Sequence, residues 1–337
     1  MILQGNALYI PLADESVQCI VTSPPYWGLR AYGTQLQVWG GEATCEHVWV
    51  DNACGRRSND GGARDRLQTD NIGSLGREQP VHNAFCAKCG AWQGELGLEP
   101  TTQLFVEHLV AVFRECRRVL RKDGVLWLNL GDSYLSATDG RNGNNLKPKD
   151  LVGIPWRVAF ALQDDGWWLR SDIIWAKTNP MPESVRDRPT RAHEYIFMLT
   201  KRARYYWNKE GAREPAVTGK WEAMPPIGDV KHLDNGNRTY SGNCPPGNGN
   251  RNMRDVWTMN TGRYRGAHFA TFPEILAKKC IMASTRAGDM VFDPFGGTGT
   301  TVATAIALGR RGTMLEINKD YCELAQQRLA RAQPGMW

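Results

Sequence analysis

The sequence lacks any long hydrophobic run: none of its 337 residues lies in an apolar stretch of about 18 residues, the length that a membrane-spanning helix requires. Its mean hydropathy of −0.46 agrees with this absence. The sequence therefore excludes a membrane-spanning protein. The N-terminal segment also lacks the basic and apolar regions of a secretory signal peptide, so we expect a cytoplasmic protein with no membrane partner.

Neither sign of charge dominates, because 41 Lys and Arg stand against 35 Asp and Glu, with a net charge of +6. This modest excess is compatible with a nucleic-acid partner but does not establish one. In a cytoplasmic protein the nine cysteines are not expected to form structural disulfides, so they fill the core, bind a metal or react. The length suits one large domain with an insertion, or two domains.

Hydrophobic spacing predicts alternating strands and helices. Short apolar runs predict strands at residues 19–21, 125–130, 168–175, 195–199, 290–293 and 312–317. Apolar residues at helical spacing predict helices at residues 104–120, 151–162, 273–284, 300–308 and 320–332. The first of these helices is expected to end at the turn Lys122-Asp123-Gly124.

Two segments interrupt this alternation of predicted strands and helices. Residues 34–100 lose hydrophobic periodicity, and we expect an insertion there without core-forming residues. Residues 204–265 are rich in Asn, Gly and Pro with scattered Arg and Lys, which predicts an irregular insert outside the core. The core is then expected to consist of residues 1–33, 101–203 and 266–337.

A glycine turn near the C-terminus is a candidate cofactor site. Residues 293–301 read DPFGGTGTT between a predicted strand and a predicted helix, where Gly297 and Gly299 let the backbone approach a ligand closely. Glu316 ends the next strand, where an acid commonly holds ribose hydroxyls. The segment lacks both the G-x-G-x-x-G spacing and the Lys of a phosphate-binding loop, which favours a cofactor with ribose and no phosphate. A plain tight turn is the alternative.

A second candidate site follows the first predicted strand, where residues 22–27 read TSPPYW. Ser23 and the carbonyl of Pro24 offer two acceptors, and Tyr26 offers an aromatic face. An exocyclic amine on a base is a poor nucleophile because its lone pair is delocalised, and accepting both of its hydrogens would free that lone pair. Base stacking on an aromatic ring contributes about 1–3 kcal/mol. A Pro-Pro strand terminator followed by a core tyrosine is the alternative.

Together the two motifs resemble those of the amino-group DNA methyltransferases, in the permuted order that places the catalytic motif first and the cofactor motif last. The resemblance implies a Rossmann-like α/β fold with a mostly parallel sheet and a target-recognition insert, and this chain adds a Cys/His-containing insertion. It implies S-adenosylmethionine as cofactor, with a flipped base methylated on its amino group. The catalytic tetrapeptide would be Ser23, Pro24, Pro25 and Tyr26. The cofactor-binding residues would be Phe269, Thr271, Phe272, Asp293, Phe295, Gly297, Gly299 and Glu316.

The target base is open at this point. In the family a tetrapeptide that begins with serine is usual for cytosine N4 enzymes, whereas adenine N6 enzymes more often carry Asp or Asn. This rule has exceptions, so Ser23 leaves the choice between cytosine N4 and adenine N6 open. Proposals of a different kind are an RNA or protein-amide methyltransferase, and a zinc-containing nucleic-acid binder with a vestigial cofactor pocket.

Two Cys/His clusters lie within the predicted insertion. Cys45 and His47, with Cys86 and Cys89, make three thiols and an imidazole, the donor set of a structural zinc. Metal binding would hold the shape of a segment that lacks a core. Cys54 and His82 are substitute ligands, and free thiols are the alternative.

The expected partner is double-stranded DNA, whose target base would have to leave the stack to enter the active site. Candidate DNA contacts are Arg186, Arg188, Arg251, Arg254, Arg263 and Arg265, with solvated surface charge as the alternative. No nuclease motif is present, so the chain is expected to modify DNA, alone or beside a separate cognate endonuclease of a restriction-modification pair. The resemblance also suggests a homodimer.

Overall fold

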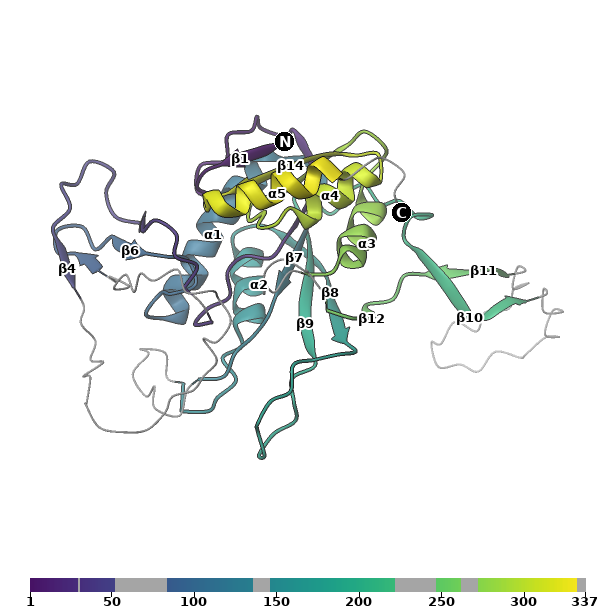
Figure 1. The fold of residues 1–337 in the computed structure, drawn as a ribbon, viewed down its shortest axis with the longest axis horizontal. Helices are drawn as coiled ribbons and strands as arrows, with labels where there is room; N and C mark the ends of the chain where they lie inside the picture. The colour runs from purple at the N-terminus through teal and green to yellow at the C-terminus, as the bar shows by residue number, and fades with distance from the viewer. Residues whose placement is uncertain (30, 52–83, 136–145, 222–246, 262–271, 332–337) are drawn as a thin grey trace, which may run out of the picture.

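The computed structural model describes residues 1–29, 31–51, 84–135, 146–221, 247–261 and 272–331. Its centre is an eight-stranded sheet in the order β1-β14-β13-β2-β7-β9-β8-β12 (Figure 1). In that order the strands are β1 (Ile2–Gln4), β14 (Arg311–Glu316), β13 (Met290–Asp293), β2 (Val17–Thr22), β7 (Leu120–Leu130), β9 (His193–Thr200), β8 (Trp168–Lys177) and β12 (Val256–Met259).

Most neighbouring strands of this sheet are parallel. Only β9 is antiparallel to its neighbours β7 and β8. Strands β13 and β2 are parallel neighbours, although β13 leads on to β14 on one side and β2 leads to β7 on the other. The predicted mostly parallel sheet is therefore confirmed. A reversal of strand order of this kind opens a crevice at the carboxyl ends of the two strands, where α/β proteins bind their ligands.

Helices cover both faces of the sheet. They are α1 (Thr102–Val119), α2 (Ile154–Asp164), α3 (Glu274–Ser284), α4 (Thr300–Ala307) and α5 (Lys319–Arg331). Alternate side chains of a strand point to opposite faces, so Ile20 of β2 packs in the cluster that contains α1 and α2, whereas Cys19 and Val21 pack in the cluster that contains α3. Burial on both faces explains why residues 19–21 of β2 and residues 125–128 of β7 are continuous apolar runs.

The end of α1 differs from the prediction. The helix ends at Val119 rather than at the Lys122–Gly124 turn, and Leu120 already begins β7. Leu120 has an extended backbone and pairs with Val17 of β2, and its side chain is fully buried. Helical spacing continues through Leu120 in the sequence, but pairing with β2 decides its conformation.

The predicted insertion contains a second sheet, which we call the ribbon sheet. Its four strands run in the order β3 (Gln37–Trp39), β6 (Trp92–Gly94), β5 (Ala84–Cys86) and β4 (Trp49–Asp51), all antiparallel. The expectation of no core-forming residues is wrong, because Trp39 and Trp92 are buried and stack on His108 of α1 with ring centroids 4.5 and 5.3 Å apart. Each strand is too short to show a hydrophobic period.

The predicted irregular insert also contains regular structure. Strands β10 (Arg213–Trp221) and β11 (Gly247–Asn252) pair antiparallel and extend to one side of the molecule (Figure 1). Strand β12 joins the central sheet beside β8 and buries Trp257, so this part of the segment belongs to the core.

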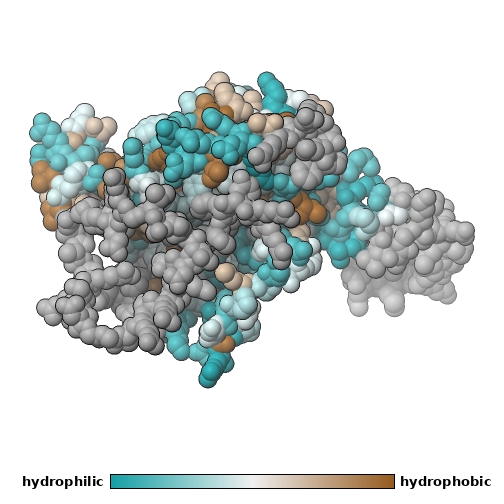
Figure 2. Space-filling model, viewed as in Figure 1, coloured by the Kyte–Doolittle hydropathy of each residue, from teal (hydrophilic) through white to brown (hydrophobic). Residues whose placement is uncertain are grey.

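On the face shown in Figure 2, the described residues are largely hydrophilic. No helix among the described residues is long and apolar enough to cross a membrane.

Candidate active site

The two sequence motifs meet at the carboxyl ends of β2 and β13. Thr22 at the end of β2 donates a 2.6 Å hydrogen bond from Oγ1 to Oδ1 of Asp293 at the end of β13. Thr301 of α4 donates to the other carboxylate oxygen at 2.9 Å, and the backbone N–H of Phe295 also donates to Asp293. Asp293 is buried, and this burial raises its pKa to about 6. The sheet order thus joins both ends of the chain in one site.

The glycine turn is built for close approach. Gly297 and Gly299 have φ values of +50° and +77°, in the left-handed region that favours glycine. The backbone N–H of Gly297 donates to Glu316 at 2.8 Å, and that of Asn318 donates to the other carboxylate oxygen at 2.9 Å. Burial raises the pKa of Glu316. The turn and the acid that ends β14 therefore form one hydrogen-bonded unit.

A cavity of about 310 Å³ lies over these motifs, a volume at the lower end of the range of small-molecule sites. Its walls include Ser23, Pro24, Pro25 and Tyr26 of the first motif, and Phe272, Asp293, Phe295, Gly297 and Glu316 of the cofactor set. Gly299, the N-cap of α4, is not among the residues that line it. Phe269 and Thr271 lie outside the described residues.

The hydroxyl of Tyr26 is the centre of a polar cluster in this cavity. It donates to Oε2 of Glu194 at 2.6 Å and accepts from Nδ2 of Asn129 at 2.8 Å. Ser23 donates from Oγ to the same hydroxyl at 3.2 Å. Desolvation, followed by the charge of Glu194, raises the pKa of Tyr26 well above its usual value. The Ser23 hydrogen is thereby engaged, which leaves its oxygen lone pairs as acceptors.

Several residues that line the cavity or contact its lining were absent from the predicted site. Asn129, a buried polar residue within the apolar strand β7, carried a signal, because such a group needs a partner. Glu194 lies on β9, and Lys177 of β8 donates to its Oε1 at 2.5 Å. Gly5 and Ala7, which follow β1, line the cavity without any signal in their sequence.

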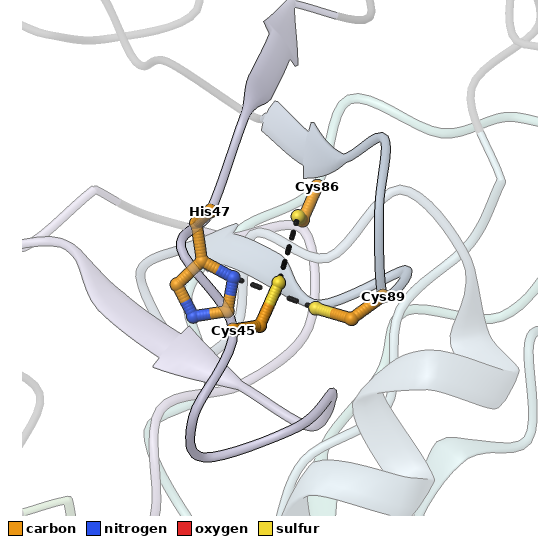
Figure 3. Close-up of side chains that lie close together, drawn as sticks. All are labelled: Cys45, His47, Cys86 and Cys89. Carbon is orange, nitrogen blue, oxygen red and sulfur yellow. Dashed lines mark hydrogen bonds between the residues drawn. The ribbon is translucent and has the colours of Figure 1, made fainter.

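The four predicted metal ligands converge (Figure 3). Their ligand atoms all lie within 4.8 Å of one another, with Cys45 Sγ 3.9 Å from Cys86 Sγ and Cys89 Sγ 3.4 Å from Nδ1 of His47. Tetrahedral Zn–S bonds of about 2.3 Å place two sulfurs about 3.8 Å apart, so the geometry fits. Against desolvation, hydrogen bonds from backbone N–H groups and from His47 lower the pKa of Cys86 to about 5, whereas desolvation and the neighbouring thiols raise the pKa of Cys45 to about 11. Cys86 is therefore the more readily available of the two as the thiolate that metals bind. Cys54 and His82 lie outside the described residues.

The candidate DNA contacts are dispersed. Arg186 is exposed, and Arg188 pairs with Glu183 at 2.6 Å. Arg251 and Arg254 both contact Oε1 of Glu214, at 2.9 and 2.6 Å. These two arginines therefore already neutralise an acid within the protein. The remaining candidates, Arg263 and Arg265, lie outside the described residues.

Comparison with known proteins is consistent with this geometry. A family model described as DNA methylase, for N6 and N4 enzymes, matches residues 17–327. The type II methyltransferase M.Cfr9I of Citrobacter freundii is 38% identical, with 97% of this chain and 87% of that protein covered. A putative DNA modification methylase of Thermus thermophilus, solved with S-adenosyl-L-methionine, has a TM-score of 0.56 at 20% identity, covering 99% of this chain and 95% of that one. The PvuII DNA methyltransferase, described as cytosine-N4-specific, has a TM-score of 0.57 at 15% identity, covering 97% and 85%. The two structures show the shared fold.

Proposed function

This chain belongs to the N6/N4 DNA methylase family, and we propose that it methylates the N4 amino group of a flipped cytosine within a specific DNA sequence. The chain is an S-adenosylmethionine-dependent DNA amino-methyltransferase. The observation that carries the proposed site is the contact between Thr22 and Asp293, which brings the cofactor and catalytic motifs to one cavity. Cytosine is supported by Ser23 at the first position of the tetrapeptide, and adenine N6 is the second candidate.

The cofactor half of the cavity suits S-adenosylmethionine. Glu316 offers carboxylate oxygens to ribose hydroxyls, and Gly297 lets the backbone approach them. Asp293 at the end of β13 would lie beside the methionine end, where its negative charge favours a cation. The bound cofactor supplies a methyl group made electrophilic by a sulfonium. No phosphate has to be held, in agreement with the absence of a lysine after the glycines.

The catalytic half positions the amine. Ser23 donates its hydrogen to Tyr26, so its oxygen can accept one hydrogen of the target amine, and the carbonyl of Pro24 can accept the other. This arrangement localises the nitrogen lone pair for in-line attack on the methyl carbon, after which the extra proton leaves to solvent. The rate enhancement would come from positioning and electrostatics.

Further proposals concern the metal and partners. We propose one zinc ion bound by Cys45, His47, Cys86 and Cys89, a closed set of four ligands that is structural rather than catalytic. Double-stranded DNA is the substrate, and we propose phosphate contacts from the candidate arginines. A homodimer, a separate cognate endonuclease and a cytoplasmic location remain predictions of the sequence.

The decisive experiment incubates the full chain with methyl-labelled S-adenosylmethionine and mixed-sequence duplex DNA, then identifies the labelled nucleoside by mass. N4-methylcytosine is the expected product. N6-methyladenine would replace the cytosine assignment with the second candidate. Label on RNA or protein alone, or no labelled product from a chain that binds the cofactor, would overturn the proposed function.

A further inference from the structure

The cavity has a third wall that belongs neither to the cofactor motif nor to the catalytic tetrapeptide. It is contributed by the ribbon sheet and its flanking segments, through Tyr32, Gln37, Trp39, Glu95 and Leu96. These residues lie before, on and just after the strands β3 and β6 that form the inner side of this sheet. The insertion is therefore part of the active-site cavity.

Three hydrogen bonds join the segment after β6 to residues 27–32, which follow the catalytic tetrapeptide. The backbone N–H of Gly28 donates to the carbonyl of Gly97 at 2.8 Å, and Nε1 of Trp27 donates to the carbonyl of Glu99 at 2.9 Å. The backbone N–H of Tyr32 donates to Glu95 at 2.9 Å. All three donors belong to the chain that leaves the catalytic tetrapeptide, so displacement of the segment after β6 would displace that chain.

The same wall reaches the cofactor side. Nδ2 of Asn6 donates to Oε1 of Gln37 on β3, and both residues line the cavity. Gly97 approaches the tetrapeptide so closely that a Cβ there would lie 3.1 Å from the carbonyl oxygen of Tyr26. The ribbon sheet thus contacts the residues that flank both halves of the site.

The Cys/His cluster connects the segment that follows β3 to the segment that precedes β6. Cys45 and His47 lie between β3 and β4, whereas Cys86 ends β5 and Cys89 lies in the turn that leads into β6. Gly41, just after β3, packs on this turn: a Cβ there would lie 2.8 Å from Cys89 Sγ and 2.6 Å from Ala91 Cβ. A sheet of three-residue strands has little stability of its own, so a metal crosslink at this point would hold β3 against β6.

We propose that a zinc ion bound by Cys45, His47, Cys86 and Cys89 positions the ribbon-sheet wall of the active site, so that metal occupancy sets the affinity for cofactor and DNA. This inference rests on the proposed function and deepens it. The four ligands act through β3 and β6 and are positioning residues.

The inner side of the ribbon sheet has a second anchor that does not need a metal. His108 of α1 stacks on Trp39 and Trp92, and its Nδ1 lies 2.9 Å from Oε1 of Glu99. Loss of the metal should therefore loosen the part of the ribbon sheet beyond these tryptophans and let the rest of the cavity wall shift, while the central sheet stays folded. This separation makes positioning distinguishable from global unfolding.

The test compares the full-length wild type with Cys89→Ser, Cys89→His and the control Cys280→Ala, whose cysteine is buried on α3 away from the cluster. Metal content, cofactor affinity by calorimetry, KM and kcat for DNA, and thermal unfolding are measured on each. We expect one zinc per chain in the wild type and the control. Cys89→Ser should lose it with a fall in kcat/KM on the order of a hundredfold, whereas Cys89→His should retain metal and recover activity.

Chelation of the folded wild type followed by zinc addition repeats the test without a substitution, in case Cys89→Ser does not fold. A wild type without zinc, or a metal-free protein with unchanged cofactor affinity and kcat/KM, overturns the inference. A zinc-containing wild type that binds cofactor but labels no DNA overturns the proposed function instead. Metal content and calorimetry still report on the wall in that case, because neither depends on DNA methylation.

Discussion

Tyr26 and Glu194 share a 2.6 Å hydrogen bond in which the phenol donates to the carboxylate. Asn129 donates to both partners at 2.8 Å, and Lys177 pairs with the other oxygen of Glu194. Because an ionised carboxylate only accepts, it sets the direction of the hydrogen bonds and draws the Ser23 hydrogen toward Tyr26. The acceptor character of Ser23 thus depends on a residue of another strand.

Replacing Glu194 by Gln should reduce kcat on the order of tenfold or more, because a neutral amide is a weaker acceptor and Lys177 loses its charge partner. Tyr26→Phe should act in the same direction, and the double variant should be less than additive because both changes break one network. Single-turnover methylation measures the effect. Strict additivity would contradict a shared network.

Ser23→Ala should lower kcat by about a hundredfold, the scale of losing one oriented polar group in an active site, with cofactor affinity retained. Calorimetry and steady-state methylation separate the two quantities. Ser16→Ala is a matched control, because Ser16 is exposed and its hydroxyl contacts only the nearby carbonyl of Ala13 among described partners. Equal activity of both variants would exclude Ser23 from catalysis.

Gly131→Ala should displace the ring of Tyr26, since a Cβ at this position would lie 2.5 Å from Cε2 of that ring. We expect a loss of activity on the order of tenfold or more from the misplaced ring, with the cofactor motif undisturbed. Methylation rate and cofactor calorimetry test this. Wild-type activity would show that the position of the ring is not required.

Cofactor affinity should fall below about pH 6, where Asp293 becomes protonated and loses the charge that favours a sulfonium. Because the folded protein binds this proton more tightly than the unfolded chain, stability without cofactor should fall as pH rises from 3.8 to about 6. Asp293→Asn should remove both trends. Calorimetry and thermal unfolding across this range measure them, and an unchanged profile in the variant would assign the trends to another group.

Arg186→Ala should weaken DNA binding and reduce the salt dependence by about one counterion if this exposed side chain contacts a phosphate. Arg254→Ala should have a smaller effect, because its guanidinium already pairs with Glu214. Affinity measured at several salt concentrations distinguishes them. A larger effect at Arg254 would place the DNA on the β10–β11 side of the molecule.

The sequence alone was sufficient for the α/β fold class, for most strands and helices of the core, and for the two motifs, because hydrophobic periodicity and turn residues act locally. It also identified the Cys/His cluster, since these residue types and their spacing indicate metal-binding chemistry without any information on the fold. The sequence did not predict that α1 ends at Val119, because strand pairing at Leu120 overrides local helical spacing.

Only the tertiary structure decided which distant residues meet. The order of strands places Thr22 beside Asp293 and brings Asn129 and Glu194 to Tyr26. It also brings the ribbon sheet against the cavity, through tryptophans on strands too short to show a period. Contacts between remote segments depend on sheet order and on burial against other elements, and no local pattern in the chain reports either.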